Sequence, residues 1–253
     1  MAFLLRLFPS LAALIIGLTF YWQLEQPQAY PWIALIGVAA VVAAIIAIGR
    51  RRNKLADLVE KMLPTVLLLI SLVFGMLLAE GFWARLAIVF FATVATFLSL
   101  ELLFLLSFMP SRYPMSGLSH VNIGYVPLII WYTVANSVGL ITFLHSPDWI
   151  HVVVMTLLSA VLFRTTGHPG ATNEQNRLWT LVGGLTGFHL GLLGVILPMS
   201  MAGQATLGMI IFCAILRLRR YLYHPLPSRR QAWLESVAAV AFLVIVMGTA
   251  RWL

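Results

Sequence analysis

Two ionisable residues lie inside otherwise apolar stretches of this sequence. Glu101 follows Leu98-Ser99-Leu100, and His189 lies in the run Gly187-Phe188-His189-Leu190-Gly191. An ionisable group at bilayer depth is costly, so it usually faces a partner or a water-filled cavity. From the cytoplasmic ends of their predicted spans, Glu101 lies about 12 Å deep and His189 about 16 Å deep. These depths permit a contact, and a carboxylate next to an imidazole could relay protons or hold a cationic ligand. Tyr125 is the alternative partner for Glu101.

A polar stripe is the second candidate for chemistry. At about 100° per residue, one face of a helix over 119–144 carries Asn122, Tyr125, Tyr132, Thr133 and Asn136. Pro127 lies within this stripe and leaves the carbonyl of Ile123 without its helical partner, which can bend the helix. The stripe is typical of a permeation path or a buried site. It is equally typical of ordinary hydrogen bonds between membrane helices.

The elements that position these residues are predicted to be membrane spans. The chain is 61% hydrophobic and 9% charged, far from the roughly 25% charged residues of soluble domains. A membrane helix needs about 20 apolar residues, and nine stretches qualify: 9–24, 31–49, 63–80, 84–108, 119–144, 149–164, 178–198, 201–217 and 231–250. The sequence therefore predicts an all-α, polytopic helical bundle. We expect residues 1–253 to form a single transmembrane domain without a separate soluble domain.

The basic residues predict the orientation of this bundle. With the N-terminus in the cytoplasm and the C-terminus outside, 14 of the 16 Lys and Arg residues lie on the cytoplasmic side, as the positive-inside rule requires. Clusters next to a span are attracted to anionic lipid headgroups, and the predicted contacts are Arg50, Arg51, Arg52, Lys54, Arg217, Arg219, Arg220, Arg229 and Arg230. Because no domain presents these residues, the net charge of +8 does not indicate a nucleic-acid partner. The expected location is a cytoplasmic (inner) membrane of the bacterial type.

Three smaller patterns predict local structure. Gly183, Gly187 and Gly191 recur at four-residue spacing, which lets a neighbouring helix approach closely, in the same chain or in a partner. Thr172 with Gln175 has the form of a capping box before an apolar run. Ser146-Pro147-Asp148 has the form of a helix start, with Ser146 as the N-cap.

One arrangement resembles a metal site. His145, Asp148 and His151 recur at spacings of three, and both side-chain types bind zinc. The same residues are explained by a capped helix start at a polar interface, so no metal and no cofactor are predicted.

The remaining motifs leave three functions open. The sequence contains no phosphate-binding loop, no zinc-protease helix and no nucleophile elbow. It favours a non-enzymatic membrane subunit or scaffold, because its loops are short and carry no catalytic motif. The first alternative is a small transporter or channel whose path is lined by the predicted spans four, five and seven. The second is an integral enzyme acting on a lipid at the cytoplasmic face, where Glu101, His120, Asn122, His168 and Glu235 would converge.

Overall fold

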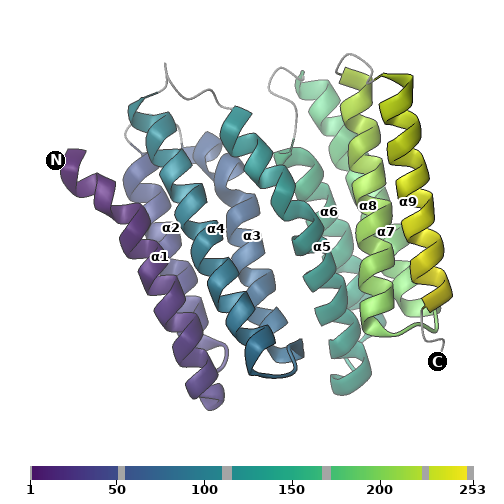
Figure 1. The fold of residues 1–253 in the computed structure, drawn as a ribbon, viewed down its shortest axis with the longest axis horizontal. Helices are drawn as coiled ribbons and strands as arrows, with labels where there is room; N and C mark the ends of the chain where they lie inside the picture. Colours follow the sequence, from purple (N-terminus) through teal and green to yellow (C-terminus); the bar gives the residue numbers. More distant parts are fainter. Residues whose placement is uncertain (1, 51–54, 110–115, 167–171, 224–227, 250–253) are drawn as a thin grey trace. The chain divides into compact units, whose positions relative to one another are not determined.

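The computed structural model describes residues 2–50, 55–109, 116–166, 172–223 and 228–249 of this chain. These residues form helices joined by short connections, and consecutive helices run in opposite directions (Figure 1). The helices are α1 (Ala2–Glu25), α2 (Trp32–Gly49), α3 (Leu55–Leu78), α4 (Phe82–Phe108), α5 (Ser116–Leu144), α6 (Asp148–Thr165), α7 (Asn173–Ile196), α8 (Met201–Tyr223) and α9 (Arg229–Thr249), with a short 3-10 turn, η1 (Pro27–Ala29), after α1.

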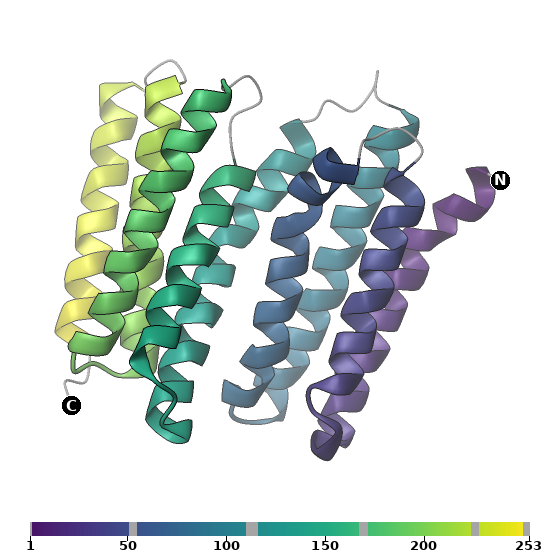
Figure 2. The ribbon, with the colours of Figure 1, turned by 180° about the vertical axis from the view of Figure 1, so that it is seen from behind.

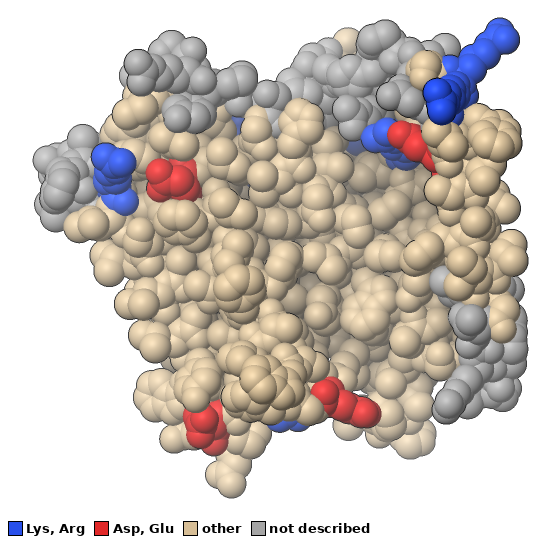
Figure 3. All heavy atoms as spheres, in the orientation of Figure 1, with Lys and Arg blue, Asp and Glu red and all other residues tan. Residues whose placement is uncertain are grey.

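The predicted helical membrane bundle is confirmed. Within the described residues, eight helices, α1 to α8, are long and apolar enough to cross a membrane. The ninth predicted span corresponds to α9, whose apolar stretch, Ala232–Ile245, is shorter. Figure 3 shows that on the visible face the charged side chains lie toward the ends of the helices, as a membrane requires. The orientation of the chain in the membrane stays a prediction.

The chain packs as two compact units. The first unit is Met1–Tyr125 and the second is Val126–Leu253, so their boundary lies inside α5. The first ten residues of α5 therefore belong with α1 to α4, and the rest of α5 belongs with α6 to α9.

The first unit is built around α1, α2 and α4. Helix α1 packs against α2 and α4, and α3 packs against α2 and α4 (Figure 2). Ile16 and Phe20 of α1, Val41 of α2 and Leu72 of α3 are completely buried. These apolar side chains form the core of the unit.

The second unit is built around the close pair of α6 and α7. A Cβ atom added to Gly183 would lie 2.6 Å from the Cβ of Phe163, and one added to Gly191 would lie 2.8 Å from the Cα of Val152. Backbones this close leave no room for a side chain on α7. The glycine stripe that the sequence indicated is therefore covered by α6 of the same chain.

Helix starts agree with the sequence at α7 but not at α6. Thr172 and Gln175 form the predicted capping box, in which each side chain accepts a hydrogen bond from the other residue's backbone N–H. The prediction that Ser146 is the N-cap of the next helix start is wrong. Helix α6 begins at Asp148 with Pro147 in the N-cap position, and Pro147 makes no side-chain capping bond.

Candidate functional site

The first half of the polar stripe forms a buried hydrogen-bond chain inside the first unit. The Tyr125 hydroxyl donates to the carbonyl oxygen of Ala95 over 3.0 Å and lies 3.0 Å from the Ser99 hydroxyl. Thr65 of α3 donates to Ser99 over 3.1 Å. Because Tyr125 has a single proton and gives it to Ala95, Ser99 must donate to Tyr125. The bonds therefore run in one direction from α3 through α4 to α5 and end at a backbone carbonyl.

Asn122 makes the second polar link of this unit. Its side chain is 4% exposed, and its amide nitrogen donates to the carbonyl oxygen of Lys61 over 2.7 Å. The bond joins α5 to α3, because Lys61 lies on α3. The Asn122 amide oxygen is buried without a hydrogen-bond partner among the described residues.

The second half of the stripe belongs to the other unit. Tyr132, Thr133 and Asn136 are half-buried on α5 after the unit boundary. The Tyr132 ring lies edge-on to Trp131, whose indole N–H donates to the Thr206 hydroxyl of α8 over 3.1 Å. The stripe that the sequence treated as one feature is thus divided between two packing environments.

Glu101 does not join either network. Its side chain is half-buried on α4, and among the residues that the structure describes it makes no hydrogen bond or ion pair. Phe97 and Leu98, one turn earlier on the helix, are 39% and 45% exposed. Glu101 lies about 10 Å along the helix from its end at Phe108. A carboxyl group at membrane depth is therefore presented at the edge of an outward, apolar helix face, and Tyr125 is not its partner.

His189 lies on the exposed side of α7, away from the glycine stripe. Its Nδ1 atom lies 2.7 Å from the carbonyl oxygen of Leu185 in the preceding turn. The ring also lines a groove of about 260 Å³ between α7 and α8, together with Thr186 and aliphatic side chains. Glu101 belongs to the first unit and His189 to the second, and a contact between them stays a prediction.

The predicted lipid-headgroup residues fall into two groups. Arg50, Arg217, Arg229 and Arg230 are exposed at helix ends. Arg219 differs from the prediction, because its side chain is 4% exposed and cannot face headgroups. Its guanidinium donates to the carbonyl oxygen of Phe163 at the end of α6 and to Asn176 of α7, and lies 5.5 Å from the Trp179 ring centre. Arg219 thus ties α8 to α6 and α7. Arg51, Arg52 and Lys54 lie outside the described residues, as does the side chain of Arg220.

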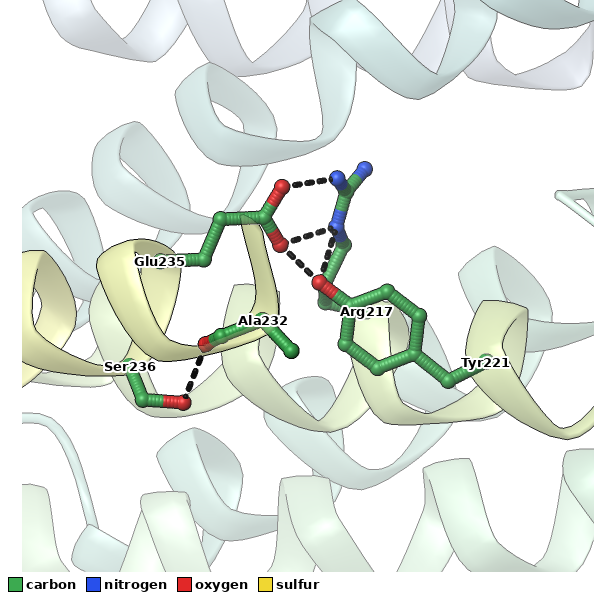
Figure 4. Close-up of polar contacts among 5 residues, drawn as sticks. All are labelled: Arg217, Tyr221, Ala232, Glu235 and Ser236. Carbon is green, nitrogen blue, oxygen red and sulfur yellow. Dashed lines mark hydrogen bonds and ion pairs between the residues drawn. The ribbon is translucent and has the colours of Figure 1, made fainter. Parts of the chain in front are cut away.

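Arg217 is exposed but already paired. Figure 4 shows two nitrogens of its guanidinium donating hydrogen bonds to the carboxylate of Glu235 on α9. The Tyr221 hydroxyl donates to the same carboxylate. Both charged side chains are about 40% exposed, at 43% and 41%. An exposed pair of this kind adds little stability, but it joins α8 to α9. The enzyme alternative of the sequence analysis included Glu235, and in the structure its carboxylate is paired with Arg217.

The weak metal candidate is not assembled. Among the described residues, no group of three or more His, Cys, Asp or Glu side chains is placed to hold a metal ion. His151 is 1% exposed and its ring packs against Gly194 of α7, whereas His145 and Asp148 are exposed. The three residues share a sequence spacing but not a common environment.

Gln204 is a polar residue that the sequence analysis did not single out. Its side chain, in the first turns of α8, is 7% exposed, and its amide nitrogen donates to the carbonyl oxygens of Leu197 and Met199. Its amide oxygen is buried and has no partner among the described residues. The available signal was a glutamine near the start of an apolar run, next to the Leu197-Pro198 break in the chain.

The geometry thus offers a bonded polar core in the first unit, an outward carboxyl group on α4, and, in the second unit, an apolar groove and a separate small cavity lined by a buried amide. Comparisons of this chain with models of protein families, with curated proteins and with solved structures found no match.

Proposed function

We propose that this chain is a non-enzymatic membrane subunit that docks against another integral membrane protein through the face of α4 next to Glu101. The observation that carries the proposal is the Glu101 carboxyl group, half-buried and without a partner among the described residues. Ionisable groups within membrane helices pair with one another or with backbone carbonyls. A partner helix that brings a basic side chain to this depth would complete the pairing.

The surrounding side chains favour docking rather than a permeation path or an enzyme. Asn122 and Tyr125, which a permeation path would need, are buried and bonded to α3 and α4. Glu235, which an enzyme at the cytoplasmic face would need, is held by Arg217. Phe97 and Leu98 next to Glu101 give the face an apolar surface that another helix can cover. The proposed location is an inner membrane, with the N-terminus in the cytoplasm.

Site-specific photo-crosslinking in cells tests this function. A photoreactive phenylalanine analogue at Phe97 should form an adduct with one partner polypeptide, whereas the same analogue at Leu181, which is 68% exposed on α7, should not. Glu101→Leu should abolish the Phe97 adduct and leave the melting temperature of the purified protein unchanged.

The variants distinguish docking from other roles of the carboxyl group. Glu101→Gln should retain part of the adduct if the partner accepts a hydrogen bond, and none if it requires an ion pair. A lower melting temperature for Glu101→Leu would assign Glu101 to the stability of the chain itself and contradict the proposal. An adduct at twice the mass of this chain would show self-association instead of a foreign partner.

A further inference from the structure

Two neighbouring hollows, which together we call the seam, lie along α7 and α8, and these helices lie side by side (Figures 1 and 2). The seam extends from Val182 to Leu197 on α7 and from Gln204 to Ile215 on α8. Because these helices are antiparallel, Val182 lies near the Ile215 end and Leu197 near the Gln204 end. The seam has a groove of about 260 Å³ at the first end and a small cavity at the second. Leu190 and Leu193 line both.

Gln204 places a hydrogen-bond acceptor at the narrow end of the seam. Its Nε2 atom is fixed by the carbonyl oxygens of Leu197, over 2.7 Å, and Met199, over 3.2 Å. The orientation of the amide is thereby set, and Oε1 is the amide atom left without a hydrogen bond. This oxygen is buried and without a partner among the described residues, and the whole side chain is more than nine-tenths buried. A buried acceptor in this state favours a ligand that donates a hydrogen bond.

The size and lining of the cavity restrict the donor. The cavity has a volume of about 10 Å³, enough for one water-sized group. A buried water usually makes about three hydrogen bonds, but the other side chains here, such as Val134 and Leu207, are apolar. A cationic headgroup is disfavoured as well, because a single neutral acceptor does not offset the desolvation of a charge. A hydroxyl carried by an apolar chain is small enough for the cavity, needs no further polar partners in its lining and carries no charge.

The position of the seam in the second unit fits a lipid. Gln204 lies within the first turn of α8, close to where α7 ends at Ile196, so it is near the end of a membrane span where polar parts of lipids lie. From there to Ile215 the seam follows α8 for about 16 Å, all within a predicted span. An apolar chain entering with its hydroxyl at Gln204 would extend into the hydrocarbon region.

We propose that the seam between α7 and α8 binds a lipid alcohol. The hydroxyl donates to Oε1 of Gln204, and the apolar chain lies along α8 past Leu207 and Ile211. This site is separate from the docking face on α4, and the two proposals stand or fall independently.

Photolabelling of the purified full chain in phosphatidylcholine nanodiscs tests the site. The probe is a long-chain alcohol with a diazirine in its chain, and the competitors are oleyl alcohol and its methyl ether, which share the chain but differ in the donor. We expect the label on α7 and α8 peptides of the seam. Oleyl alcohol should compete about fivefold better than the ether, the change expected from one neutral hydrogen bond. Equal competition by the two compounds would overturn the role of Gln204.

Matched variants locate the site. Ile211→Trp should fill the seam and remove the labelling, whereas Leu218→Trp, on an exposed part of α8 outside the seam, should leave it unchanged. Gln204→Met should retain labelling but lose the preference for the alcohol over the ether. If Gln204→Met fails to fold, the competition in the natural protein still decides the question. Labelling that survives Ile211→Trp would overturn the proposal.

Discussion

Replacing Gly187 by alanine should force α6 and α7 apart. A Cβ atom at Gly187 would lie 2.6 Å from the Oγ and 2.7 Å from the Cβ of Ser159, and it would also meet the backbone carbonyl of Met155. Ordinary van der Waals contact begins at 3.4 Å, and the Ser159 Cβ cannot rotate away from its own backbone. The Met155 carbonyl oxygen is nearer still and belongs to the backbone, so the two helices must separate by about 1 Å, which disturbs the closest helix pair of the second unit.

Gly184→Ala is the matched control, because it makes the same chemical change about one helical turn before Gly187 on α7. Its nearest atoms would be at 3.8 Å, on Ala160, and at 4.0 Å, on Thr156, so nothing needs to move. Both variants gain about 1 kcal/mol in helix propensity, and this gain cancels when they are compared. The remaining difference is the cost of overpacking at Gly187, about 1–3 kcal/mol.

Thermal unfolding in detergent, followed by tryptophan fluorescence, measures this difference. For a chain of this length, 1 kcal/mol changes the melting temperature by about 2–4 °C. Gly187→Ala should therefore melt several degrees below Gly184→Ala. If the two variants melt together, or if Gly187→Ala is the more stable, the close packing of α6 on α7 is refuted.

Three further predictions follow from the described contacts. Arg219→Gln should lower the free energy of unfolding by more than about 2 kcal/mol, because it removes the charge-assisted hydrogen bonds of a buried guanidinium. Arg217→Gln should lower it by at most about 1 kcal/mol, because the pair with Glu235 is exposed. Similar melting temperatures for the two variants would contradict the burial of Arg219. Tyr125→Phe should cost about 1 kcal/mol, and combining it with Ser99→Ala should cost less than the sum of the single changes, as double-mutant unfolding can show. A reporter fused after Leu253 that is active only outside the cytoplasm should be active, and a silent reporter would contradict the predicted orientation.

The helices themselves were readable from the residues. Apolar runs of about 20 residues must form helices in a membrane, since no water is present there to satisfy a free backbone N–H or carbonyl. Charged and proline-containing breaks end these runs, so α2 and α4 match the predicted 31–49 and 84–108 within two residues. The capping box of α7 was equally readable, because Thr172 and Gln175 bond to neighbours only three residues away.

Contacts between helices were only partly readable. The glycine stripe predicted a close approach, but not that α6 would make it. The stripe on α5 predicted buried polar contacts, but not that Tyr125 would choose Ser99 and Ala95 instead of Glu101. Arg219 and Arg217 lie close together in the same basic segment of the sequence, yet Arg219 is buried and Arg217 is exposed.

The sequence by itself determined the membrane-spanning class, the approximate positions of the helices and the faces on which polar and small residues gather, because these follow from backbone hydrogen bonding and from the period of one helix. The tertiary structure decided the partner of each face: a carbonyl for Tyr125, α6 for the glycines, a buried set of acceptors for Arg219, a small cavity for Gln204 and none among the described residues for Glu101. These pairings depend on which helices pack together and at what distance, and a pattern along one chain segment does not contain that information.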